Sequence, residues 1–172
     1  MARLRPDEAA RRLLRTYQIS QPPVPIENIA TSEGARIVRQ HSKGPESGFA
    51  LREGGRWIIG INTQTSRRRQ RFSIAHELGH LLLHEGKLIV SSVRLDLRNQ
   101  ISSLGTDKEE IEANRFAAEL LMPRNLVQAA ASAKLSEGLP GRDELIAELA
   151  REFDVSNEAM GYRLINLGVL SS

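Results

Sequence analysis

Two histidines and a glutamate stand together in the middle of the chain, in the segment His76-Glu77-Leu78-Gly79-His80. If this segment is helical, the histidines project from one face about one turn apart, and both imidazoles can bind the same metal ion. Glu77 then lies at the edge of that face, where it can take a proton from an attacking water without binding the metal. The segment therefore predicts a metal-dependent hydrolytic site.

The neighbours of this segment favour a buried helix over an ordinary polar helix surface. Ile74, Leu78, Leu81 and Leu82 form the apolar side that a core-facing helix needs. Gly79 has no side chain, so another element can approach the helix closely at that point. The three polar residues are thus expected in the interior, where a metal site is the better explanation for them.

A third metal ligand is expected from another part of the chain. His84 continues the spacing of the two histidines, but it would lie about 12 Å from His76 along the helix axis, too far for two ligands of one zinc ion. We expect His84 to be a helix-end histidine near the negative end of the helix dipole, or a residue of the cleft.

Glu110 is the favoured third ligand. It lies in a second helical segment and shares a helix face with the small Ala113 and with Asn114, which is one turn further on. Asn114 can orient a ligating histidine through the ring nitrogen that does not bind the metal. Glu112 is the competing ligand, and without a metal either glutamate would be a solvated surface charge.

The two segments together closely resemble the ImmA/IrrE family of bacterial and phage metallopeptidases. They read RFSIAHELGHLLLH at 71–84 and EIEANRFAAELLMP at 110–123, and further similarity covers 48–61 and 153–164. The resemblance implies a thermolysin-type, gluzincin-like zinc endopeptidase with His76, His80 and Glu110 as ligands of Zn²⁺ and Glu77 as the catalytic base. Zinc is the default metal for the motif, although manganese and iron also accept two histidines and one carboxylate.

The resemblance also implies a protein substrate. Members of the family typically cleave a helix-turn-helix transcriptional repressor and so release phage, mobile-element or stress-response genes. Many relatives carry a fused DNA-binding domain, which we do not expect ahead of the first peptidase helix here. We therefore expect a separately encoded repressor as the partner.

Two other functions stay open from the sequence. A DNA-binding module could use helices at 144–167 and the arginines at 67–69 and 71, but its recognition segment, 157–163, is poor in base-reading cations. Direct DNA binding is therefore not expected, and the arginine run is interpreted as a solvated helix face. A metal-binding protein that sequesters its partner without turnover is the second alternative, and the presence of Glu77 argues against it.

Peptide hydrolysis also needs a donor for the oxyanion of the transition state. Tyr162 is the favoured residue, and His84 and Arg163 are the alternatives. Each of the three side chains could equally have a structural role.

Composition limits the remaining possibilities. The 172 residues, 40% of them hydrophobic, suffice for one domain with a real core, and the absence of cysteine excludes disulfides, thiolate zinc clusters and a cysteine nucleophile. The formal charge of +3 is weak support for nucleic-acid binding. No stretch resembles a signal peptide or approaches the roughly 20 apolar residues of a membrane span, so we expect a cytoplasmic protein without membrane contact.

The predicted fold is α+β and mainly helical, with the metal helix packed against a twisted sheet of about three strands. We divide it into a zincin-like domain, 1–140, and a helical, helix-turn-helix-like subregion, 141–172.

Strands are predicted at 36–39, 48–52 and 56–61, and 88–100 is a strand or an extended active-site loop. Helices are predicted at 6–18, 26–32, 66–84, 106–122, 142–153 and 156–167, with another that begins at Pro123. The core candidates are Phe72, Leu78, Leu82, Phe116, Leu120, Ile146, Leu149 and Leu164.

Overall fold

The computed structural model describes residues 5–43, 47–53, 55–84, 106–138 and 141–171, so the segment 88–100 lies outside the described residues. The described chain has an α+β fold, as predicted. Its helices are α1 (Pro6–Thr16), α2 (Ile26–Ser32), α3 (Arg67–Leu83), α4 (Thr106–Leu121), α5 (Arg124–Glu137), α6 (Arg142–Phe153) and α7 (Asn157–Asn166). Its strands are β1 (Ala35–Gln40), β2 (Gly48–Glu53) and β3 (Arg56–Asn62). No described helix is both long and apolar enough to cross a membrane.

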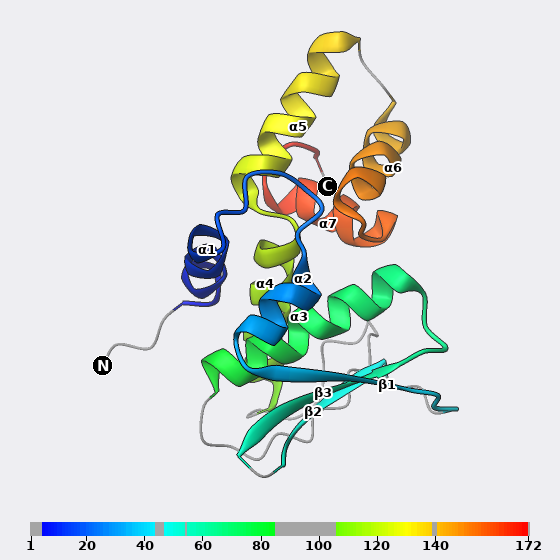
Figure 1. The fold of residues 1–172 in the computed structure, drawn as a ribbon. Coiled ribbons are helices and arrows are strands. Elements are labelled where there is room, and N and C mark those ends of the chain that lie inside the picture. The colour runs from blue at the N-terminus through cyan, green and yellow to red at the C-terminus, as the bar shows by residue number, and fades with distance from the viewer. Residues whose placement is uncertain (1–4, 44–46, 54, 85–105, 139–140, 172) are drawn as a thin grey trace.

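The three strands form one sheet in the order β1-β3-β2. β2 and β3 are antiparallel and form the predicted hairpin, whereas β1 runs parallel to β3. The phenyl ring of Phe49 covers Gly60 on the central strand, where a Cβ would lie 2.2 Å from the ring. Ile59 and Ile61 alternate along the same strand and are buried. The sheet thus supplies an apolar support for α3, which lies across it (Figure 1).

Helix α3 is enclosed on nearly all sides. It begins after its N-cap residue Ser66, whose hydroxyl accepts a hydrogen bond from the backbone N–H of Arg69. β2 and β3 contact it on one side, and α2 and α4 contact it elsewhere (Figure 1). All residues from Ser73 to Leu81 are buried. Polar side chains in this stretch are therefore in the protein interior, where each needs a partner or a function.

Helix α4 approaches α3 closely at Gly79. A Cβ at Gly79 would lie 2.9 Å from Cδ1 of Phe116 and 3.3 Å from Cα of Ala113. The missing side chain therefore allows the close approach that the sequence predicted. This contact brings the N-terminal half of α4, which carries the acidic residues, against the histidines of α3.

Helices α6 and α7 form the predicted pair near the C-terminus. α6 has the predicted bounds, and Asp154 ends it in the left-handed conformation with a φ of 53°. Pro123 is the residue before α5 and has extended backbone angles, so the expectation that it begins that helix was wrong. The division at 140 and 141 stays a prediction, and the buried residues of α6 and α7 belong to the same core as the rest of the chain.

The core candidates fall into two groups. Phe72, Leu82 and Ile146 are only partly buried and pack against the core. The other candidates are buried, and they are Leu78, Phe116, Leu120, Leu149 and Leu164.

The arginine run at the start of α3 is only in part the solvated face that its charge predicted, because the side chain of Arg67 is 82% exposed. Arg71 is only 8% exposed, and its guanidinium donates hydrogen bonds to the backbone oxygens of Val24 and Asp154. Arg67 and Arg68 lie 3.2 and 3.7 Å from the carboxylate of Asp154. Because Asp154 follows α6, these contacts join α3 to the C-terminal helices. Arg71 therefore has a structural role, whereas Arg67 stays exposed.

Candidate metal centre

Three side chains with metal-binding atoms converge between α3 and α4. Their ligand atoms all lie within 4.8 Å of one another, and the residues are His76, His80 and Glu110. The Nε2 atoms of the two histidines are 3.0 Å apart, and each is 3.2 Å from an oxygen of Glu110. Tetrahedral ligands at 2.0–2.1 Å from zinc would be separated by about 3.3 Å. The three residues therefore fit a single metal ion.

Asn114 fixes the orientation of His76. Its Oδ1 lies 2.9 Å from Nδ1 of the imidazole, which is the contact predicted from the helical spacing. An amide oxygen only accepts hydrogen bonds, so Nδ1 carries the hydrogen. The lone pair of a neutral His76 is then on Nε2, the atom that faces Glu110 and His80.

His84 and Glu112 fix the orientation of His80, a role that the sequence reasoning missed. Oε2 of Glu112 lies 3.0 Å from Nε2 of His84, and Nδ1 of His84 lies 3.2 Å from Nδ1 of His80. The carboxylate accepts from Nε2–H, so Nδ1 of a neutral His84 accepts the hydrogen of His80. The lone pair of His80 is thereby also on Nε2. His84 is the C-cap residue of α3, which agrees with the predicted position at the end of the helix.

The electrostatics of the cluster suit metal ligands. Burial lowers the pKa of His80, which keeps its ring neutral and able to bind a cation. Burial acts to raise the pKa of Glu110, but the two neighbouring imidazoles of His76 and His80 outweigh burial and hold that pKa below its ordinary value. Glu110 is therefore ionised. Two neutral imidazoles and one carboxylate are a donor set that zinc accepts.

Glu77 is buried beside this cluster without a hydrogen-bond partner. Its exposed fraction is 0%, and neither carboxylate oxygen has a partner in the described chain. Burial, and secondarily the charge of Glu110, raises the pKa of Glu77 well above its ordinary value. A buried carboxyl group without partners is costly to the fold and has a perturbed pKa, both of which are typical of reactive sites.

The three residues considered for the oxyanion have different surroundings. The guanidinium of Arg163 donates to Glu119 and to the backbone oxygen of Met122, so it is engaged in packing α7 against α4. His84 is engaged with His80 and Glu112. Tyr162 is 49% exposed and lines a cavity that also includes Asn114. Its role at the oxyanion stays a prediction.

A buried helix with two histidines and a glutamate, completed by a carboxylate from a neighbouring helix, is the arrangement of a metallopeptidase centre. The chain belongs to the IrrE N-terminal-like domain family of peptidases, whose model matches residues 30–165. The family predicted from the two sequence segments is thereby confirmed.

The chain is similar to two curated proteins. The chain is 36% identical over 108 residues to the radiation response metalloprotease IrrE of Deinococcus deserti, across 62% of this chain and 35% of that protein. It is 28% identical over 115 residues to the uncharacterized immunity region protein 2 of Bacillus phage phi105, across 67% of this chain and 66% of that protein. The chain therefore spans less than two thirds of either relative.

A solved structure has the same fold. A Mycobacterium tuberculosis transcriptional regulator superposes with a TM-score of 0.58 at 18% sequence identity, across 93% of this chain and 46% of that one. At this identity the similarity concerns the fold alone.

Proposed function

We propose that the chain is a zinc-dependent endopeptidase with His76, His80 and Glu110 as the metal ligands and Glu77 as the general base. The observation that carries this proposal is the convergence of the three ligand atoms beside a buried carboxyl group that has no other partner. Membership of a peptidase family supports the same conclusion.

The chain's own residues divide the work of peptide hydrolysis. A divalent ion held by the three ligands supplies Lewis acidity that favours attack by water on the peptide carbonyl. Glu77 takes the proton of the attacking water and gives it to the nitrogen of the leaving amine. The raised pKa of Glu77 suits this exchange, because an ordinary glutamate would be too weak a base to accept the proton and too strong an acid to keep it for delivery.

We further propose a helix-turn-helix transcriptional repressor as the protein substrate. The supporting observations are the resemblance of both motif segments to repressor-cleaving peptidases and the relatedness to a phage immunity region protein. Cleavage would then relieve repression of phage, mobile-element or stress-response genes.

Metal content and repressor cleavage, measured together, test the proposal. The wild type, Glu77→Gln and Glu110→Ala are compared with a repressor encoded beside the gene as substrate. We expect cleavage to be lost in both variants, with stoichiometric zinc retained only in Glu77→Gln. Cleavage by Glu77→Gln at the wild-type rate would overturn the assignment of the base, and zinc retained by Glu110→Ala would overturn the third ligand.

A further inference from the structure

A large groove opens next to the metal centre. Its volume is about 960 Å³, and its walls come from α1, the first turns of α3, α4, the start of α5, and α7. Asn114 lines the groove and also holds His76 by the hydrogen bond to Nδ1. Phe72 lines it one turn before His76, with 6.3 Å between the two ring centroids. His76, His80 and Glu110 are not among the lining residues, so a chain bound in this groove would contact the neighbours of His76 and not the ligands themselves.

The lining of the groove includes exposed apolar side chains. In the described part of the chain, the large apolar side chains that stand out as exposed are Ile111, Leu135 and Tyr162. Two of these, Ile111 at 44% and Tyr162 at 49%, line the groove. Exposed apolar side chains gathered in one concavity are typical of a binding site and are costly to leave in water.

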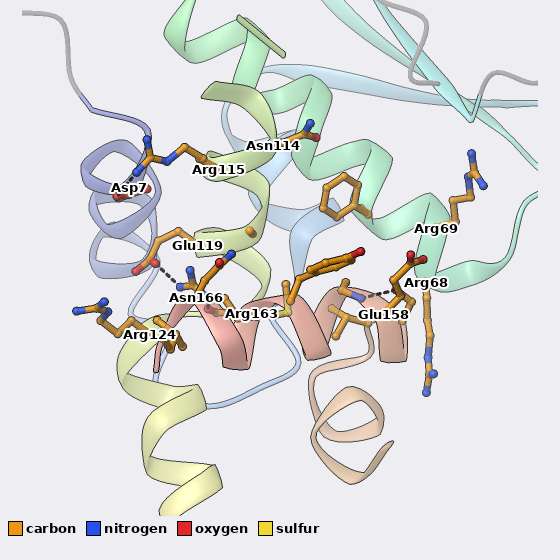
Figure 2. A pocket seen from close by; sticks show the side chains of 18 of the residues that line it. Asp7, Arg68, Arg69, Asn114, Arg115, Glu119, Arg124, Glu158, Arg163 and Asn166 are labelled. Atoms are coloured by element: carbon orange, nitrogen blue, oxygen red, sulfur yellow. Dashed lines mark hydrogen bonds and ion pairs between the residues drawn. The ribbon is translucent and has the colours of Figure 1, made fainter. Parts of the chain in front are cut away.

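The ends of the groove are positively charged. Arg68 and Arg69 lie at one end, and Arg115 and Arg124 lie at the other (Figure 2). Six lining residues are arginines and three carry carboxylates, so the formal charge of the lining equals the +3 of the whole chain. The net positive charge of the protein is thus concentrated here.

Several of these arginines are available to a ligand. Arg124 has no ion pair within the described residues, and the guanidinium of Arg69 donates to the neutral hydroxyl of Ser47. The guanidinium of Arg115 lies as far as 4.0 Å from the carboxylate of Asp7, and the Arg115 side chain is 60% exposed, so that ion pair is weak. By contrast, Arg11 and Arg163 are both engaged with the buried Glu119.

We propose that this groove binds an extended segment of the protein substrate in which acidic side chains flank an apolar one. The acidic groups would contact the arginines at the two ends, and the apolar group would pack on Tyr162 and Ile111. The inference rests on the proposed peptidase function and names the chemistry of its substrate. Carboxylates such as Glu158 interrupt the rim, which disfavours a continuous phosphate backbone and favours a peptide.

Binding is measured separately from cleavage. The full chain with Glu77→Gln, loaded with zinc, is titrated against a fluorescein-labelled peptide in which a leucine pair is flanked by glutamates, and anisotropy gives the affinity. The groove variant adds Arg115→Glu and Arg124→Glu. The matched control adds Arg12→Glu and Arg151→Glu, which make the same charge change at exposed positions outside the groove.

We expect the groove variant to lose about tenfold or more in affinity for the acidic peptide, and the control to lose about twofold through screened long-range attraction. Tyr162→Ala should weaken binding of this peptide but not of one with serines in place of the leucines. Equal losses in groove and control variants, or equally tight binding of a peptide with lysines in place of the glutamates, would overturn the proposal.

Two further outcomes separate this inference from the function on which it rests. Tighter binding of a single-stranded oligonucleotide of matched length and charge would assign the groove to nucleic acid and overturn the peptide proposal. Groove-dependent peptide binding by a protein whose wild type cleaves no repressor would refute the peptidase function while the groove assignment stands.

Discussion

Two buried glutamates on neighbouring helices have opposite surroundings. Glu119 on α4 is 3% exposed and accepts hydrogen bonds from Arg11 on α1 and Arg163 on α7. Glu77 on α3 is 0% exposed and has no hydrogen-bond partner in the described chain. The fold uses the charge of Glu119 to join three helices, whereas it makes no use of the carboxyl group of Glu77. The difference separates a buried group that stabilises the protein from one that is available for a reaction.

The largest expected effect is on catalysis at Glu77. Glu77→Gln should reduce repressor cleavage by roughly 10²–10⁴-fold, the usual contribution of general acid–base catalysis. The Tm of the metal-free protein should stay the same or rise, because no partner of the carboxyl group is lost. Thermal unfolding and cleavage are measured on the same preparation. A large fall in Tm would mean that the fold depends on Glu77 and would break the contrast with Glu119.

The reverse pattern is expected at Glu119. Glu119→Gln leaves Arg163, whose side chain is only 12% exposed, without a counter-charge, so the free energy of unfolding should fall by roughly 3–5 kcal/mol. Urea denaturation measures this loss. Zinc binding by the molecules that remain folded should be unchanged, and a specific loss of zinc affinity at unchanged stability would show that Glu119 belongs to the metal centre.

An intermediate effect on metal affinity is expected from the residues that orient His80. His84→Ala and Glu112→Gln should each weaken zinc binding by about 10–100-fold, as loss of an outer-sphere partner of a ligating histidine usually does. Competition with a chelating dye gives the affinity, and Glu144→Gln, an exposed substitution on α6, is the control. Wild-type zinc affinity in both variants would show that the hydrogen bonds to His80 have no function.

The smallest effect is expected far from the centre, at the ion pair between Lys134 of α5 and Glu148 of α6, which are 3.0 Å apart. Lys134→Met should cost about 0.2–1 kcal/mol of stability and leave metal binding unchanged. The hydrogen bond to Glu148 raises the pKa of Lys134. The contribution is therefore complete below the ordinary lysine pKa and is lost as the pH rises through the raised value. A pH-independent difference between wild type and variant in urea would contradict this account.

The sequence was informative wherever function followed from spacing along one helix. The four-residue spacing of His76 and His80, and of Glu110 and Asn114, was enough to predict which side chains share a face, and the geometry brings all four together. The family resemblance supplied the pairing of the two helices.

Contacts between distant segments could not be predicted in the same way. His84 continued the helical spacing, but its partner Glu112 is 28 residues away, and local pattern carries no information on that distance. Arg71 lies in a run of arginines whose charge predicted exposure, whereas its partner Asp154 is 83 residues further along the chain. The groove likewise depends on α1 and α7 meeting α4, which no local pattern indicates.

The contact at Gly79 has a consequence for protein engineering. The five-residue motif alone would not form a metal site on another helix, because the third ligand comes from a second helix that must lie close to the first. A methyl group at position 79 would prevent this approach, because it would collide with Phe116 and crowd the backbone at Ala113. The smallest transplantable unit is therefore a matched pair of helices, with a glycine on one opposite an alanine on the other. A designer who grafts the histidines alone would obtain a polar helix without a site.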